Sequence, residues 1–185
     1  MAKVSKSTMR EVLTEVGRDL VVAIRGELER QGHINTGRLR DSIGYNISEF
    51  GGNMTLTVLA NEVDYASAIN DGFHPKSLPN VYAIEEWVKQ RRIQSDNPKI
   101  ANSKNPDKAL AFAIAKAIQD EGSPTRGSFK FSRNGFRRGF ANRPFGSRKN
   151  SIHSKIVKGM TLELEISLDS ITKETVLPLE VLYLT

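Results

Sequence analysis

The side chains that could do chemistry are few and lie far apart in the sequence. The three histidines, His33, His74 and His153, fall in separate segments, and none has a second ligand at helical metal-site spacing. The chain has no cysteine, which excludes a thiol nucleophile and a cysteine-ligated zinc site. The phosphate loop, the dinucleotide fingerprint and the Gly-x-Ser-x-Gly motif are also absent. We therefore expect no cofactor, no metal and no small-molecule substrate.

Two groups of acidic and amide side chains remain as candidates for acid–base chemistry. Glu163 and Glu165 lie two residues apart on the polar side of an alternating stretch, and Asp64, Asn70 and Asp71 cluster near Tyr65 and His74. Solvated strand residues account for the first group, and helix-terminating turn residues account for the second. We predict that the protein is not an enzyme, and a hydrolase or nuclease is the weakest of three hypotheses.

Charge is concentrated in one segment of the chain. The 185 residues carry 27 Lys and Arg against 21 Asp and Glu, a formal net charge of +6. Residues 122–162 contain ten of the basic residues and no acidic one, so the rest of the chain has a net charge of −4. Five of the eight phenylalanines also fall in this segment. Such a segment attracts polyanions, and its aromatic rings can stack on bases or anchor in a partner protein.

We predict that residues 123–157 form a basic arm or extended loop that contacts a partner. Its candidate contact residues are cationic or aromatic: Arg126, Phe129, Lys130, Phe131, Arg133, Phe136, Arg137, Arg138, Phe140, Arg143, Phe145, Arg148 and Lys149. Docking on the acidic body of another copy or of a neighbouring protein is the first interpretation. Contact of residues 126–158 with nucleic acid is the second, and a merely disordered insertion is the third.

Hydrophobic periodicity predicts the elements that carry this arm. Apolar residues at spacings of three and four predict a long helix over residues 5–31. Alternating residues on both sides of Gly51–Asn53 predict a β-hairpin. We expect Asn35 or Thr36 to cap a short helix before the hairpin, and Trp87 to anchor the core.

The remaining pattern completes an α+β fold. It predicts a short helix over 65–73, longer helices over 81–93 and 106–121, and strands over 160–168 and 176–184. We expect an antiparallel sheet of about four strands, with the long N-terminal helix and two further helices packed on it. Residues 1–122 and 158–185 would form this single domain. The chain shows neither a secretory signal nor a membrane-spanning run, so we expect no membrane partner.

The order of several short motifs carries a family resemblance. A long helix is followed by Thr-Gly-x-Leu-x-x-Ser-Ile at 36–43, a hairpin, Tyr65-Ala66 with Gly72, and Ile-x-x-Trp-Val at 84–88. A helix that ends in Gly-Ser-Pro at 122–124 completes the series. The residues that carry the signature are Thr36, Gly37, Leu39, Ile43, Tyr65, Ala66, Gly72 and Trp87. The series resembles the head–tail joining proteins (neck or tail-completion proteins) of lambda-like siphophages, over residues 5–125 and more loosely after 158.

The resemblance implies a structural virion protein of a bacteriophage, without an active site. It implies a homo-oligomeric ring of six or twelve copies in the neck between capsid and tail, assembled in the host cytoplasm. The partners would be the adjacent connector, portal and tail proteins, with possible contact to packaged DNA. The sequence departs from the family pattern at Asn70 and Asp71, where a glutamate is usual, and at Phe73, where a threonine is usual.

Overall fold

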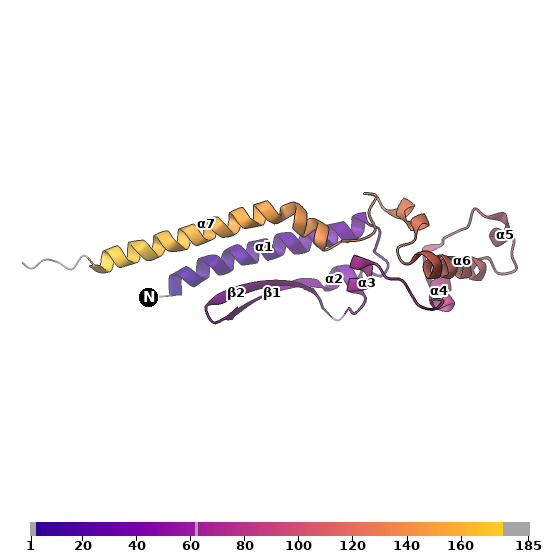
Figure 1. The fold of residues 1–185 in the computed structure, drawn as a ribbon, viewed down its shortest axis with the longest axis horizontal. Coiled ribbons are helices and arrows are strands. Elements are labelled where there is room, and N and C mark those ends of the chain that lie inside the picture. Colours follow the sequence, from indigo (N-terminus) through magenta and orange to yellow (C-terminus); the bar gives the residue numbers. More distant parts are fainter. Residues whose placement is uncertain (1–2, 62, 176–185) are drawn as a thin grey trace, which may run out of the picture.

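The computed structural model describes residues 3–61 and 63–175, which form an elongated molecule of mixed helix and sheet (Figure 1). A long central helix lies between a second long helix on one side and a β-hairpin on the other. A small helical lobe lies at the opposite end of the molecule from the hairpin's turn. The predicted α+β class and the long N-terminal helix are confirmed.

The central helix α1 (Lys3–Arg30) packs its apolar face on the hairpin of β1 (Ile43–Phe50) and β2 (Asn53–Ala60). The strands pair antiparallel in the hairpin that the turn residues predicted, and their register places Ile43 opposite Ala60 and Phe50 opposite Asn53. Gly17 permits the close approach of helix and sheet, because a Cβ there would lie 2.7 Å from Cδ2 of Tyr45.

The second long helix, α7 (Asn142–Thr175), runs antiparallel to α1 on the side away from the hairpin. Nζ of Lys155 lies 2.6 Å from Oε1 of Glu15, and further along α7 the Glu163 carboxylate accepts a hydrogen bond from the Met9 backbone N–H at 3.1 Å. The helices nearly touch at Gly159, where a Cβ would lie 2.9 Å from Cγ2 of Val12.

The strand predicted over 160–168 is wrong, because these residues belong to α7. Their period-two alternation favours a strand, but Met, Leu and Glu dominate the composition and are strong helix formers. The Thr161 and Ser167 hydroxyls donate to the carbonyl groups four residues earlier, as helical geometry permits. The described residues therefore hold a two-stranded sheet, and the four-strand count is not confirmed. The final strand predicted over 176–184 lies outside the described residues.

Short helices flank the hairpin, and three more build the lobe. α2 (Arg38–Ser42) precedes β1, and α3 (Ala66–Asp71) follows β2 and ends at Gly72 as predicted. In the lobe, α4 (Val81–Arg91) packs on α6 (Pro106–Glu121), and α5 (Pro98–Ala101) contacts α6. The α2 cap prediction is wrong, because Gly37 occupies the N-cap without a side-chain cap bond.

The main core lies where α1 ends and the other elements converge. Its buried members come from five parts of the chain: Ile24, Leu28, Leu39, Ile43, Val63 and Phe140. Phe140 belongs to the predicted arm, so the arm contributes to the core of its own chain. The arm also holds a short 3-10 helix η1 (Arg126–Phe131), and α7 begins within it at Asn142.

Candidate functional site

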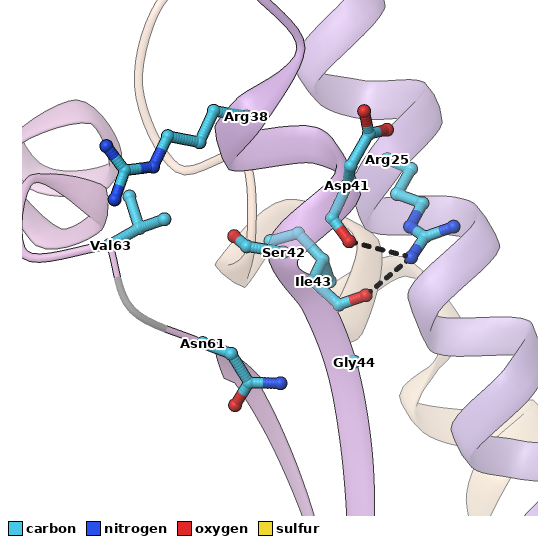
Figure 2. Close-up of a pocket in the computed structure, with 8 residues that line it drawn as sticks. All are labelled: Arg25, Arg38, Asp41, Ser42, Ile43, Gly44, Asn61 and Val63. Atoms are coloured by element: carbon cyan, nitrogen blue, oxygen red, sulfur yellow. Dashed lines mark hydrogen bonds between the residues drawn. The ribbon is translucent and has the colours of Figure 1, made fainter.

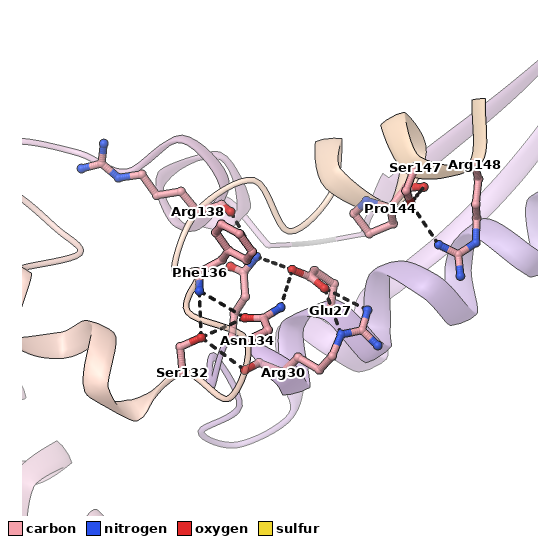
Figure 3. A network of polar contacts seen from close by, with 10 residues as sticks. Glu27, Arg30, Ser132, Asn134, Phe136, Arg138, Pro144, Ser147 and Arg148 are labelled. Carbon is pink, nitrogen blue, oxygen red and sulfur yellow. Dashed lines mark hydrogen bonds and ion pairs between the residues drawn. The ribbon is translucent and has the colours of Figure 1, made fainter. Parts of the chain in front are cut away.

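The middle of the predicted arm is fastened to the end of α1 by a buried polar network (Figure 3). The Glu27 carboxylate, whose side chain is 7% exposed, accepts hydrogen bonds from Arg30 at 2.8 Å and Gln31 at 2.8 Å. It also accepts one at 2.9 Å from Asn134, which lies 107 residues further along the chain. The Arg138 carbonyl accepts a bond from Gln31 at 3.0 Å. Residues 132–138 are therefore held against α1 rather than projecting freely.

Glu27 stays ionised because its environment favours the charged form. Burial alone raises the pKa of Glu27, but the hydrogen bonds from Gln31, Arg30 and Asn134 outweigh it and hold the pKa below its ordinary value. A negative charge thus anchors the basic segment within the same chain.

Phe140 and Asn70 fix the next part of the arm. The Phe140 ring is 3% exposed in the main core, which corrects its prediction as a partner-contact residue. The Asn70 carbonyl accepts from the Gly139 N–H at 2.6 Å, and its side-chain oxygen accepts from the Ala141 N–H at 3.0 Å. In the sequence, Asn70 is a turn residue and a departure from the resembled motif, and neither observation predicts its contact with the arm.

The remaining candidate arm residues lie on different parts of the surface. Arg143 stacks on the Phe136 ring with its guanidinium carbon 3.2 Å from the ring centroid, and Lys130 lies over Phe131 at 5.2 Å. Arg137 is half-buried. The others are exposed: Arg126, Phe129, Arg133, Arg138, Phe145, Arg148 and Lys149. The predicted contact residues therefore fall into three groups: one is buried in the core, some contact the end of α1, and the others are exposed to solvent.

The signature of residues 36–43 lies where α1, α2 and β1 meet, and Figure 2 shows Arg38, Asp41 and Ile43 of this segment. Leu39 and Ile43 are each 4% exposed in the core, and Gly37 has a φ of 83°, which favours glycine. The Arg25 guanidinium donates to the carbonyl oxygens of Asp41 at 3.3 Å and Ile43 at 2.8 Å. Thr36 makes a long contact with the Arg38 N–H at 3.4 Å. These residues build the fold, beside a pocket of about 540 Å³.

The later signature residues have mixed environments. Gly72 has a φ of 78°, and a Cβ there would lie 2.6 Å from Nε of Arg138. Tyr65 is 43% exposed at the start of α3, and Ala66 packs beside the core. The prediction that Trp87 anchors the core is wrong, because its side chain is 36% exposed and lines a groove.

This groove, which we name the Trp87 groove, separates the end of α1 from the helical lobe. One part, of about 850 Å³, is lined by residues that include Trp87, Arg91, Arg133 and Arg137. It continues into an apolar part of about 330 Å³, lined by residues that include Ile84 and Ile118. Trp87 and Arg137 line both parts. One end of the groove is therefore cationic and the other apolar.

His33 and Arg137 meet at the junction of the two parts. Nε2 of His33 donates to the Arg137 carbonyl at 3.1 Å, and the Arg137 guanidinium donates to the Gln31 carbonyl. Burial and the neighbouring Arg137 cation lower the pKa of His33 to about 4, so His33 is neutral at pH 7. Burial also lowers the pKa of Arg137, which keeps its charge. The buried Nε of Arg137 has no hydrogen-bond partner among the described residues.

An exposed apolar face on α7 is a further surface that sequence reasoning missed. Val157, Met160, Leu164 and Leu168 are between 44% and 63% exposed. Their spacings of three, four and four place them on one side of the helix. We name this surface the α7 apolar face. The alternating pattern of residues 160–168 indicated a strand. The spacing that places these side chains on one exposed side applies only to a helix, so this apolar surface was not predicted.

The described residues gather no group of three or more histidine or acidic side chains that could hold a metal ion. In the same part of the chain, no helix combines the length and apolar character that crossing a membrane requires. No protein-family model, curated protein or solved structure matches the chain.

Proposed function

We propose that this chain is a non-enzymatic structural subunit of a virion, a ring-forming connector that joins the portal side of a phage head to the tail. The α7 apolar face carries the proposal. Four large apolar side chains in a row on an exposed helix disfavour a solitary molecule in water, and such a pattern is typical of helices that pack on a partner.

The partner on this face is a second copy of the chain. Lys155, Gly159 and Glu163 define the side of α7 that contacts α1, and helical geometry turns the α7 apolar face largely away from it, so a neighbouring copy would pack on the outer side of α7. A heterologous contact of this kind repeats from copy to copy and closes into a ring when its rotation allows. The series of signature motifs supports the connector assignment, with adjacent portal and tail proteins above and below the ring.

The test is the oligomeric state of the full chain and of a variant with Leu164→Asp and Leu168→Asp. We expect rings for the natural sequence, seen by electron microscopy and mass photometry, and monomers for the variant, because two buried carboxylates would oppose packing. Glu165→Gln, an exposed change on the same helix, should still assemble.

Two results would contradict the connector proposal. One is a natural chain that stays monomeric at all concentrations. The other is an assembled chain that fails to join tails to DNA-filled heads in an in vitro assembly reaction.

Nucleic-acid binding is a second candidate, which the exposed arm cations favour. Seven exposed cations of the arm form no ion pair within the described residues: Arg126, Lys130, Arg133, Arg138, Arg143, Arg148 and Lys149. A strong DNA affinity that falls steeply with salt, and that is lost when these cations become glutamine, would favour this candidate over protein docking.

A further inference from the structure

The Trp87 groove has the dimensions and chemistry of a site for an extended peptide. Its two connected parts measure about 850 and 330 Å³. Trp87, Ile114 and Ser128 are common to both, so the groove continues from the cationic end into the apolar end. Pockets of this kind bind a chain that presents apolar side chains next to an acidic group.

At the cationic end, three arginines face a single acidic residue on the lining. Arg133 and Arg137 form no ion pair among the described residues, and Arg91 bonds only the neutral side chain of Asn35, at 3.0 Å. Glu29 is the acidic residue on the lining, and it already pairs with Arg40 at 3.4 Å. An occupant with a carboxylate would therefore be favoured at this end.

The chain itself contains a segment of matching chemistry directly after α7. Residues 176–185 comprise four leucines, two valines, a tyrosine, a proline, a threonine and one charged residue, Glu180. The segment has apolar side chains for the apolar part of the groove and one carboxylate for its arginines.

The segment cannot reach the groove of its own molecule. Glu163 on α7 lies beside Met9, which is about 30 Å along α1 from the groove residue Glu29. The rest of α7 to Thr175 adds about 18 Å in the same direction. Ten residues span at most about 35 Å when fully extended. The occupant of the groove must therefore come from another copy.

We infer that residues 176–185 of one copy bind in the Trp87 groove of the next copy, with Glu180 near Arg133. The segment follows α7 in the sequence, so one neighbouring copy could contact both the α7 apolar face and this segment. This inference rests on the proposed homo-oligomeric function and specifies how one subunit holds the next. The contact joins two different surfaces, so it directs head-to-tail assembly.

The groove is tested with a full-length variant, Leu182→Asp with Leu184→Asp, and a synthetic peptide of residues 176–185. Trp87 is the single tryptophan and the peptide has none, so tryptophan emission reports the groove alone. We expect a saturable blue shift on titration. Adding Arg133→Glu to the variant should weaken peptide binding about tenfold, whereas Arg148→Glu, which makes the same charge change outside the groove, should not. An unchanged emission, or equal effects of the two arginine changes, would overturn the inference.

Assembly provides a second, independent test. Alone, the Leu182→Asp/Leu184→Asp variant and the Arg133→Glu variant should each assemble poorly. Mixed, they should form one-to-one dimers, because each supplies the surface that the other lacks. Assembly of the Leu182→Asp/Leu184→Asp variant into normal rings would overturn the inference and leave the connector proposal intact. A monomeric natural chain would instead contradict the connector proposal. The peptide titration would still test whether residues 176–185 bind in the Trp87 groove.

Discussion

Single residues in the basic segment have opposite roles that their type does not reveal. Phe140 and Phe145 are both phenylalanines five residues apart, yet the first is 3% exposed and the second 52% exposed. The sequence pattern assigned both to a partner-binding arm, because interleaved arginines and glycines gave no helical or strand period. The burial of Phe140 depends on a core shared with Ile24 and Leu28, more than a hundred residues earlier, which local pattern does not encode.

Replacement of Phe140 should therefore affect stability rather than partner binding. We expect Phe140→Ala to lower the free energy of unfolding by about 3–5 kcal/mol, because it leaves a cavity in the main core. Phe145→Ala should cost less than about 1 kcal/mol. Urea unfolding followed by circular dichroism measures both values, and equal losses would contradict the assignment of Phe140 to the core.

His33 should make the stability of the molecule depend on pH. The pKa of His33 is about 4 in the folded chain, against an ordinary value of 6.5, so the unfolded chain binds more protons between these values. The contribution of neutral His33 is complete above about pH 6.5 and is lost as the pH falls through about 4. We expect the urea midpoint to fall between pH 7 and pH 5.

His33→Gln keeps a donor for the Arg137 carbonyl but cannot titrate, so it serves as the matched variant. Its urea midpoint should change less between pH 7 and pH 5 than that of the natural chain. Glu27 stays largely ionised between pH 7 and pH 5, because its pKa is lowered from an ordinary value of 4.5, so its titration contributes little in this interval. An identical pH response in the two proteins would assign the effect to another group.

At the scale of elements, the contact between α1 and α7 depends on small residues at close approach. Gly159 on α7 nearly touches Val12, and Gly17 on the other side of α1 receives Tyr45 from β1. Helix propensity disfavours glycine at these interior positions by about 1 kcal/mol relative to alanine. The three-layer arrangement therefore requires glycine where local preference argues against it.

A larger side chain at position 159 should separate the two long helices. We expect Gly159→Val to lower the free energy of unfolding by about 1–3 kcal/mol, because its Cβ would meet Val12. Gly146→Val lies in the same helix with nothing within 4 Å and should be nearly neutral. Thermal unfolding of the two variants gives the comparison, and similar midpoints would contradict close packing at Gly159.

Most elements followed from local signals, and the exceptions have physical causes. The hairpin, α3, α4 and α6 carried clear turn or capping residues, such as Asn105 before Pro106 and Gly72 after α3. Pro144 lies in the first turn of α7, where proline is favoured, but the glycine- and arginine-rich sequence around it gave no helical period, and the alternating second half of α7 matches a strand as well as a helix. Packing on α1 decides between them. The groove could not be predicted, because it forms between parts of the chain that are separate in sequence.

At the scale of the whole molecule, the basic segment is partly neutralised by its own body. Lys155 pairs with Asp19 and Glu15, and their hydrogen bonds hold the pKa of Lys155 above its ordinary value. The Glu27 carboxylate accepts a hydrogen bond from Asn134 of the arm. Part of the positive charge of the basic segment is therefore paired with acidic residues of the same chain, and only the rest is exposed for a partner. The exposed cations that remain are those that the proposed contact with a partner protein or with nucleic acid would use.

The anchoring of residues 132–141 also determines where a protease can act. Trypsin cleaves after lysine and arginine where the backbone is accessible and can open locally into an extended conformation. The carbonyl groups of Arg137 and Arg138 are engaged by His33 and Gln31. We expect early tryptic cuts after Arg126 and Lys130, whereas the bonds after Arg137 and Arg138 should survive until the domain unfolds. Mass spectrometry of a timed digest would show that order, and immediate cleavage after Arg138 would mean that the segment is a loose linker.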